Sequence, residues 1–196
     1  MTKANLFFPT PVWTSIINNY KETNEEIYNF IKNLQNLDNK GVKKSNIKGW
    51  HSSDFDMKDK VPKKFIEMIS PKINEVLVDM DWNLKIQKVK ISSMWAIINI
   101  GGAENARHHH GNNSLSAAYY VRAPEDAGEI VFYDPRPAPV YFHPTSNKPN
   151  GLNAMVNSIT PKEGLLVLFP SYLEHSVNPN LSDNERIVIS FNISIL

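Results

Sequence analysis

The sequence predicts an α+β chain that is mainly β: an antiparallel jelly roll with N-terminal helices packed on one of its sheets. Residues 1–84 contain two segments with the periodicity of amphipathic helices, and residues 85–196 contain about eight short segments typical of strands. With 196 residues and 41% hydrophobic composition, the chain is expected to be a single domain. Within it, residues 1–84 would form a helical support region and residues 85–196 the jelly-roll core.

Both helices are predicted from apolar stripes at helical spacing. The first is expected from Thr23 to Leu37, because Thr23 and Glu26 form a capping-box pattern just before the stripe. The second is expected from about Pro62 to Met80, since proline suits the first turn of a helix. Pro71 lies inside this segment and predicts a kink or two shorter helices.

The strands are predicted from β-branched or alternating runs bounded by Gly, Pro, Asn and Asp. They cover residues 85–91, 92–100, 114–121, 129–133, 154–159, 165–169 and 186–195. Residues 134–153 include four prolines between positions 134 and 144, so we expect a long loop there.

Composition excludes several classes of site and partner. The chain has no cysteine, which excludes disulfides, thiolate metal sites and a cysteine nucleophile. A net charge of +1 disfavours nucleic acid as a partner, and no apolar run is long enough to span a membrane. The N-terminus lacks the apolar core of a signal peptide, so the expected location is cytoplasmic. The oligomeric state stays open, with a homodimer among the options.

A run of three histidines gives the first indication of chemistry. Alternate side chains of an extended segment share a face, so His108 and His110 should point together and His109 away. Two imidazoles at this spacing can converge on one metal ion, and His175, at the start of a later apolar segment, is the best candidate for a third ligand. His109 is the alternative ligand if the backbone here is not extended.

Arg186 lies eleven residues after His175 and begins a strand whose two faces differ. Ile187, Ile189, Phe191 and Ile193 form an apolar face suited to packing under the helices, whereas Arg186, Ser190 and Asn192 share the other face with Val188. If that polar face lines the interior, the buried guanidinium needs an anion, and a carboxylate fits it through two parallel hydrogen bonds. A metal site together with this arginine therefore favours a small dicarboxylate cosubstrate.

This constellation resembles the iron(II)/2-oxoglutarate-dependent oxygenase superfamily, and more narrowly a family of small, mostly uncharacterised bacterial and phage proteins within it. The similar segments cover nearly the whole chain: residues 6–13, 45–52, 105–121, 134–136, 164–175 and 186–192. The resemblance implies a double-stranded β-helix, a jelly-roll or cupin-like fold, that holds Fe(II) through His108, His110 and His175. This set of three histidines departs from the usual triad of two histidines and one carboxylate, because His110 stands where Asp or Glu is common.

The resemblance further implies an Fe(II)- and 2-oxoglutarate-dependent dioxygenase that hydroxylates an unidentified substrate. Arg186 would fix the distal carboxylate of 2-oxoglutarate, and Tyr119, Ser190 and Asn99 are the further candidate cosubstrate contacts. Two alternatives stay open: a cupin-type enzyme with three histidines and no 2-oxoglutarate, and a jelly-roll binding module without activity. Arg186 discriminates against the first, which has no need of an interior cation at that place.

Overall fold

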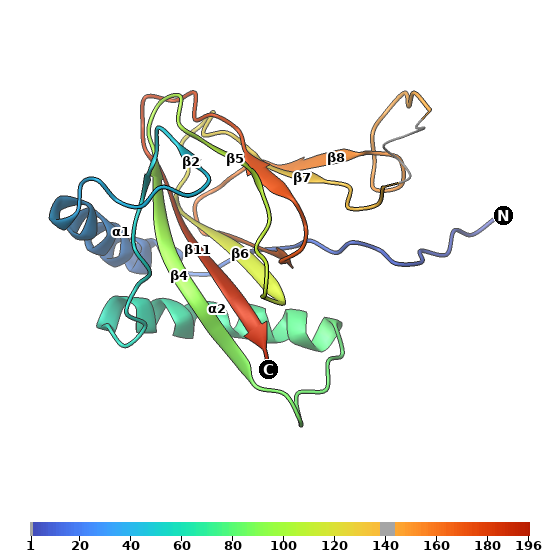
Figure 1. Ribbon diagram of the computed structural model, residues 1–196, viewed down its shortest axis with the longest axis horizontal. Coiled ribbons are helices and arrows are strands. Elements are labelled where there is room, and N and C mark those ends of the chain that lie inside the picture. Colours follow the sequence, from blue (N-terminus) through green and yellow to red (C-terminus); the bar gives the residue numbers. More distant parts are fainter. Residues whose placement is uncertain (1, 138–143) are drawn as a thin grey trace.

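Two antiparallel β-sheets face each other in the computed structural model, which describes residues 2–137 and 144–196 (Figure 1). The larger sheet, called here the major sheet, has the strand order β1-β9-β6-β11-β4-β3. Its strands are β1 (Trp13–Ile16), β3 (Trp50–His51), β4 (Val89–Asn99), β6 (Leu115–Arg122), β9 (Leu165–Pro170) and β11 (Arg186–Ile195). The minor sheet has the order β2-β5-β10-β7-β8. Its strands are β2 (Asn46–Ile47), β5 (Glu104–His108), β7 (Ile130–Tyr133), β8 (Val156–Ile159) and β10 (His175–Val177).

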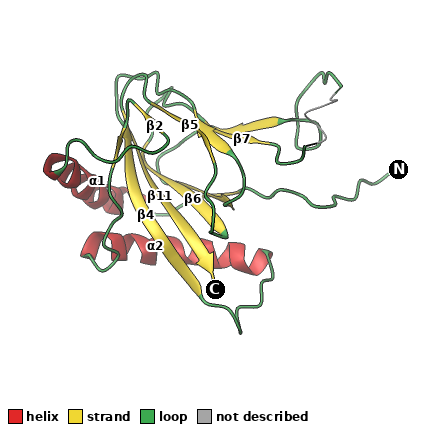
Figure 2. Ribbon diagram, viewed as in Figure 1, coloured by secondary structure: helices red, strands yellow, loops and turns green. Residues whose placement is uncertain are grey.

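Two helices, α1 (Tyr20–Leu37) and α2 (Lys60–Asp79), cover the outer face of the major sheet (Figure 2). Their apolar stripes pack against the alternate residues of β11 that were expected to face them: Ile187, Ile189, Phe191 and Ile193, all fully buried. Burying this apolar face of β11 stabilises the fold by about 25 cal/mol for each Å² of apolar surface that is removed from water. The other face of β11 is turned towards the minor sheet. The expected jelly roll with helices on one sheet is therefore confirmed.

Several element boundaries differ from those expected. Helix α1 begins at Tyr20 rather than Thr23, after Asn19 in a left-handed conformation, and its N-cap makes no side-chain hydrogen bond, so the capping box is not formed. Helix α2 runs through Pro71 as one helix. Residues 89–99 form one strand where two were expected. The region before residue 85 also supplies β1, β2 and β3, which are too short to show a periodic pattern.

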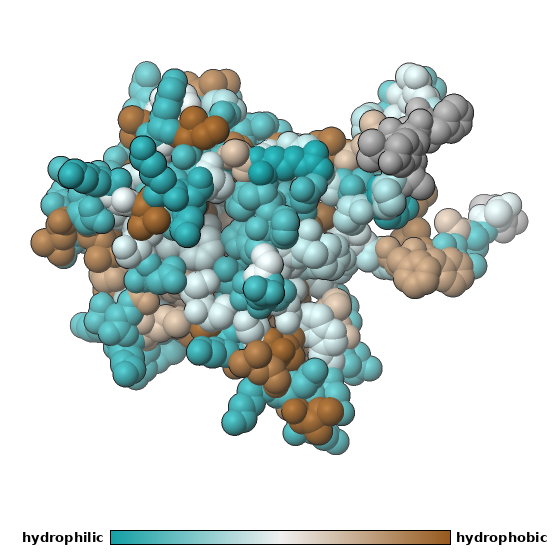
Figure 3. Space-filling view, in the orientation of Figure 1, coloured by the Kyte–Doolittle hydropathy of each residue, from teal (hydrophilic) through white to brown (hydrophobic). Residues whose placement is uncertain are grey.

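The visible face of the molecule is mostly hydrophilic, with separate apolar patches (Figure 3). One lies at the lower edge, where the connection from α2 to β4 runs, and Leu84 and Ile86 of that connection are exposed. In the part of the chain that the structure describes, neither helix combines the length and the apolar character needed to cross a bilayer. The expected loop at residues 134–153 is irregular where it is described, and residues 138–143 lie outside the described residues.

Candidate metal and cosubstrate site

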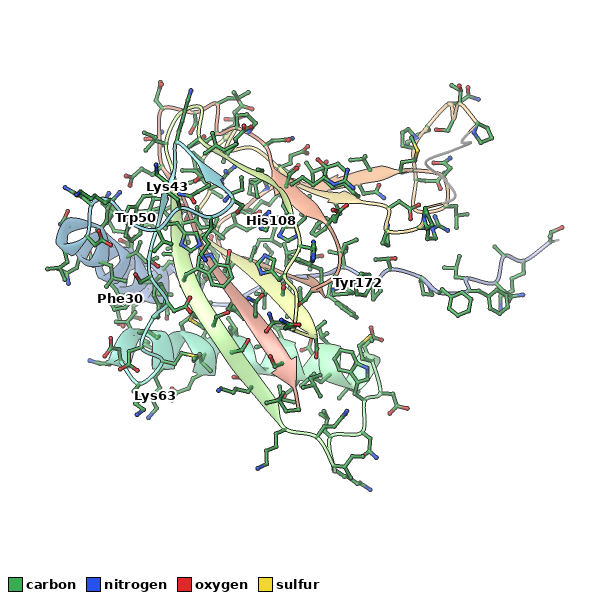
Figure 4. The ribbon with its side chains drawn as sticks, viewed as in Figure 1. Phe30, Lys43, Trp50, Lys63, His108 and Tyr172 are labelled. Atoms are coloured by element: carbon green, nitrogen blue, oxygen red, sulfur yellow. The ribbon has the colours of Figure 1, made fainter. Side chains whose placement is uncertain are left out.

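Two histidines that are close in the sequence and a third from a later segment meet between the sheets. His108 ends β5 and His175 begins β10, and the two residues are direct partners in the antiparallel register. His110 follows β5 in the turn towards β6, where its backbone N–H donates to the Ser171 carbonyl at 2.9 Å. One nitrogen from each ring lies within 4.8 Å of the others. Figure 4 shows His108 in the space between the two sheets.

The hydrogen bonds of the rings decide which nitrogen of each imidazole is free to bind a metal. The Nδ1–H of His108 donates to the Ala106 carbonyl at 2.7 Å, and that of His175 to the Leu173 carbonyl at 3.0 Å. The Nδ1–H of His110 donates to Asn192 Oδ1 at 2.8 Å. Because these oxygens act as acceptors, each Nδ1 carries the proton and each Nε2 keeps a free lone pair. Three imidazole lone pairs that converge in this way fit a divalent transition metal such as Fe(II).

The protonation of these rings also suits a metal site. The pKa of His110 is lowered to about 4 and that of His175 to about 3. Burial is the larger cause for both rings, and the nearby His108 is the second. Burial also lowers the pKa of His108. The rings are therefore neutral at physiological pH and need not release a proton before they bind a metal. His109, by contrast, is exposed and outside this cluster, although it borders the mouth of the cavity described next.

A cavity of about 670 Å³ extends from the histidine cluster to Arg186. The polar face of β11 lines it, with Arg186, Ser190 and Asn192 placed at every second or fourth position along the strand. Apolar side chains from both sheets complete its walls: Ala118, Ile130, Phe169, Val177 and Val188. The volume is in the range of small-molecule sites, and the apolar walls limit the access of water.

Arg186 is 1% exposed and has no acidic partner among the residues that the structure describes. Its Nη1 donates to three backbone carbonyls, those of Ala127, Gly128 (3.0 Å) and Asn178 (3.1 Å). Burial lowers the pKa of the guanidinium to about 10, yet the group stays charged at neutral pH. A buried charge that only dipoles compensate is costly, so this end of the cavity fits a ligand carboxylate.

The structure corrects the choice of tyrosine. Tyr119 lies on the helix side of β6, where its hydroxyl donates to Asn24 Oδ1 at 2.6 Å and its ring packs against Phe65. It does not line the cavity, so the prediction that Tyr119 binds the cosubstrate is wrong. Tyr120 lines the cavity instead, next to Arg186, and burial raises its pKa to about 12. Register explains the error: Tyr120, not Tyr119, lies opposite Val188 on the cavity face of β11.

The two other candidate contacts have different places. Ser190 lines the cavity and is half-buried. Asn99 is buried behind the cavity, opposite Arg186 in the register of β4 and β11. With its amide oxygen turned towards the guanidinium, Asn99 accepts a hydrogen bond from Arg186 Nη2. Asn99 thus supports the arginine and does not face the ligand space.

Besides Tyr120, sequence reasoning missed two residues of the site. Asn192 was placed on the correct strand face, but its hydrogen bond to a histidine 82 positions away depends on the fold. Trp95 is buried in β4, as a core residue would be, but it lines the cavity and stacks on His110. Its Nε1 is the one buried side-chain nitrogen or oxygen without a hydrogen-bond partner in the described part of the chain. Such an orphan donor costs about 1–3 kcal/mol, so its presence here requires an explanation.

Solved structures of low sequence identity share this fold. A prolyl-4-hydroxylase from Pseudomonas putida matches with a TM-score of 0.66 at 11% identity, over 94% of this chain and 92% of that one. The viral collagen prolyl hydroxylase of Paramecium bursaria Chlorella virus-1, in its 2OG complex, matches with a TM-score of 0.60 at 15% identity, over 93% and 94%. HygX from Streptomyces hygroscopicus, with nickel and 2-oxoglutarate bound, matches with a TM-score of 0.63 at 12% identity, over 94% and 82%. No curated protein matches the sequence.

A family model described as "Putative 2OG-Fe(II) oxygenase" matches residues 93–192, which are 100 of the 196 residues. The matched region contains the three converging histidines and the buried Arg186. This supports the oxygenase expectation over the cupin-type enzyme and the inactive module. The chain thus belongs to the 2OG-Fe(II) oxygenase family, and it is an oxidoreductase whose cofactors are Fe(II) and 2-oxoglutarate.

Proposed function

We propose that this oxygenase is of the hydroxylase type and inserts oxygen into a C–H bond of a substrate that enters the cavity. The observation that carries the proposal is the pairing, in one cavity, of a neutral three-histidine cluster with a buried arginine that has no acidic partner among the described residues. When bound, Fe(II) and 2-oxoglutarate supply the oxidising chemistry, in which O2, 2-oxoglutarate and R–H give succinate, CO2 and R–OH. Two structures of this fold are named prolyl hydroxylases, which supports the reaction type.

Each residue of the site has a distinct part in this proposal. His108, His110 and His175 would hold the metal through Nε2, because their Nδ1 atoms are occupied. Arg186 would bind the distal carboxylate of 2-oxoglutarate, with its guanidinium held in place by three carbonyls and Asn99. The hydroxyls of Tyr120 and Ser190 line the space between these groups and are the next polar contacts available to the cosubstrate.

The outer part of the cavity is the proposed space for the substrate. Its wall is formed by residues of the segment that contains β2 and β3, namely Lys44, Ser45, His51 and Asp54. A cavity of about 670 Å³ is larger than 2-oxoglutarate alone requires, which leaves room for a small molecule or for one side chain of a larger substrate.

The experiment uses ¹⁸O₂. The Fe(II)-loaded protein is incubated with 2-oxoglutarate and a pool of small metabolites and peptides, and mass spectrometry follows succinate and the pool. Hydroxylation predicts one ¹⁸O in succinate and one in a product, at equal rates. Succinate formation coupled to a product without ¹⁸O would contradict the hydroxylase type, while the oxygenase family would stand.

A further inference from the structure

Three aromatic rings form a continuous stack at the edge of the histidine cluster. The Trp95 ring lies between those of His51 and His110, with centroid distances of 5.6 Å on both sides. The interplanar angles are 10° and 17°, so the three rings are nearly parallel. Offset parallel rings at this separation attract one another. The stack therefore connects β3, β4 and the turn that carries His110.

The unpaired indole N–H indicates that the stack sets the orientation of Trp95. A buried tryptophan is normally placed so that its N–H finds an acceptor. Trp95 lacks one, while both of its faces are covered by imidazoles. His51 is itself fixed, because its Nδ1–H donates to the Ser52 carbonyl at 2.6 Å and the Ser52 hydroxyl accepts from the Ala96 N–H at 2.9 Å. The contacts that hold the indole within the described protein are therefore the two imidazoles and not a hydrogen-bond acceptor.

Asn192 forms a hydrogen bond with the edge of the His110 imidazole. Its Oδ1 accepts from His110 Nδ1 and from the Ser116 hydroxyl, both at 2.8 Å, and its Nδ2 donates to Ser93 Oγ at 2.9 Å. In this orientation the amide presents an acceptor to Nδ1, which selects the His110 tautomer that leaves Nε2 free.

His110 needs such contacts more than the other two histidines do. His108 and His175 each donate to a carbonyl two residues earlier in their own segment, at Ala106 and Leu173. His110 lies outside β5 and has no such local bond; its ring is held by Asn192 and Trp95, which come from different strands of the major sheet. A free imidazole can turn about its Cβ–Cγ bond and exchange its two nitrogens.

We propose that Trp95 and Asn192 are positioning residues that hold His110 by its face and by its edge, with Nε2 directed into the metal site, and that His51 supports Trp95 from behind. This inference rests on the proposed metal site. It assigns to Trp95 a function in the site in place of the core role that its burial suggests.

The test compares variants that keep or remove each contact. Trp95→Phe keeps a ring and removes the unpaired donor, whereas Trp95→Leu removes the ring. Asn192→Asp keeps an acceptor, and Asn192→Leu removes it at similar volume. Trp82→Leu makes the same change in a tryptophan that packs at the edge of the helix-side core and is the matched control. Affinity for Co(II) is measured by anaerobic calorimetry, with indole fluorescence recorded in parallel.

We expect the two leucine variants at positions 95 and 192 to bind Co(II) about 10–100-fold more weakly. Trp95→Phe, Asn192→Asp and Trp82→Leu should stay within about threefold of the wild type. Co(II) should quench the indole fluorescence of the wild type and quench Trp95→Phe much less, although that variant binds. If Trp95→Leu or Asn192→Leu loses its cooperative unfolding transition, Trp95→Met or Asn192→Ala replaces it.

The outcomes separate this inference from the proposed function. Wild-type protein that does not bind Co(II) would overturn the metal site itself. If the wild type binds Co(II) and both Trp95→Leu and Asn192→Leu keep its affinity, the positioning inference is overturned and the metal site stands. Equal losses in Trp95→Phe and Trp95→Leu would also overturn it, because the indole volume and not the ring stack would then matter.

Discussion

Replacement of Arg186 should separate cosubstrate binding from metal binding. A charge-assisted hydrogen bond contributes about 1.5–3 kcal/mol, and 1.4 kcal/mol is a factor of ten in affinity. Arg186→Ala should therefore weaken 2-oxoglutarate by roughly 10–100-fold and leave affinity for the metal nearly unchanged. Because the guanidinium also holds the carbonyls of Ala127, Gly128 and Asn178, the variant should unfold at lower denaturant concentration as well. Arg186→Lys keeps the charge but loses the planar fork, so it should be intermediate.

A comparison of two ligands tests the role of Arg186 more directly than the substitution alone. 2-Oxopentanoate has a methyl group in place of the distal carboxylate of 2-oxoglutarate. Wild-type protein loaded with Mn(II) should prefer 2-oxoglutarate strongly in anaerobic calorimetry, and Arg186→Ala should lose most of that preference. Arg122, which pairs with Glu25 at 2.6 Å at the opposite end of β6 from the metal site, supplies the matched control Arg122→Ala. Equal discrimination by the wild type and Arg186→Ala would refute the assignment of the arginine.

Three further predictions concern the histidines and the tyrosines. His109→Ala should keep one equivalent of bound metal in a Co(II) titration and His110→Ala should lose it; the reverse result would exchange their roles. Burial lowers the pKa of the site histidines, so below pH 6.5 the unfolded chain takes up protons that the folded metal-free protein does not. The stability of the metal-free protein should therefore be level above pH 6.5 and fall as the pH decreases towards 3. Denaturant unfolding at several pH values checks this, and His175→Ala should reduce the slope. Tyr119→Phe should lower the free energy of unfolding by about 1–3 kcal/mol without changing the affinity for 2-oxoglutarate. Tyr120→Phe should weaken 2-oxoglutarate binding severalfold with little loss of stability. Denaturant unfolding and calorimetry on both variants check this, and an exchange of the two effects would contradict it.

Strand β11 shows how much of the fold could be predicted. Its period of two separates an apolar face from a face with Arg186, Ser190 and Asn192, and both faces lie where the pattern indicates. A pattern of this kind is local, so the sequence suffices to define it. The two helices were found for the same reason, although the start of α1 depends on the backbone conformation of Asn19 rather than on a capping box.

What could not be predicted depends on register between strands. The sequence places Tyr119 and Tyr120 on opposite faces of β6, but which of them faces the cavity follows from pairing with β11, and a slip of one residue exchanges them. The contact of Trp95 with His110 likewise joins β4 to a turn across the sheet interior. The direct pairing of His175 with His108 belongs to the same class: the sequence offered His175 as the best candidate for a third ligand, but its place beside His108 follows from the pairing of β10 with β5.

An anaerobic titration of 2-oxoglutarate into the protein with and without Fe(II) tests most directly whether the histidine cluster and Arg186 form one cosubstrate site. We expect one equivalent of 2-oxoglutarate to bind to the Fe(II)-loaded protein, and affinity to be at least tenfold weaker without the metal, because the metal and Arg186 would hold opposite ends of the cosubstrate. Fe(II) binding with no uptake of 2-oxoglutarate would contradict it and would leave a three-histidine metal site that works without this cosubstrate.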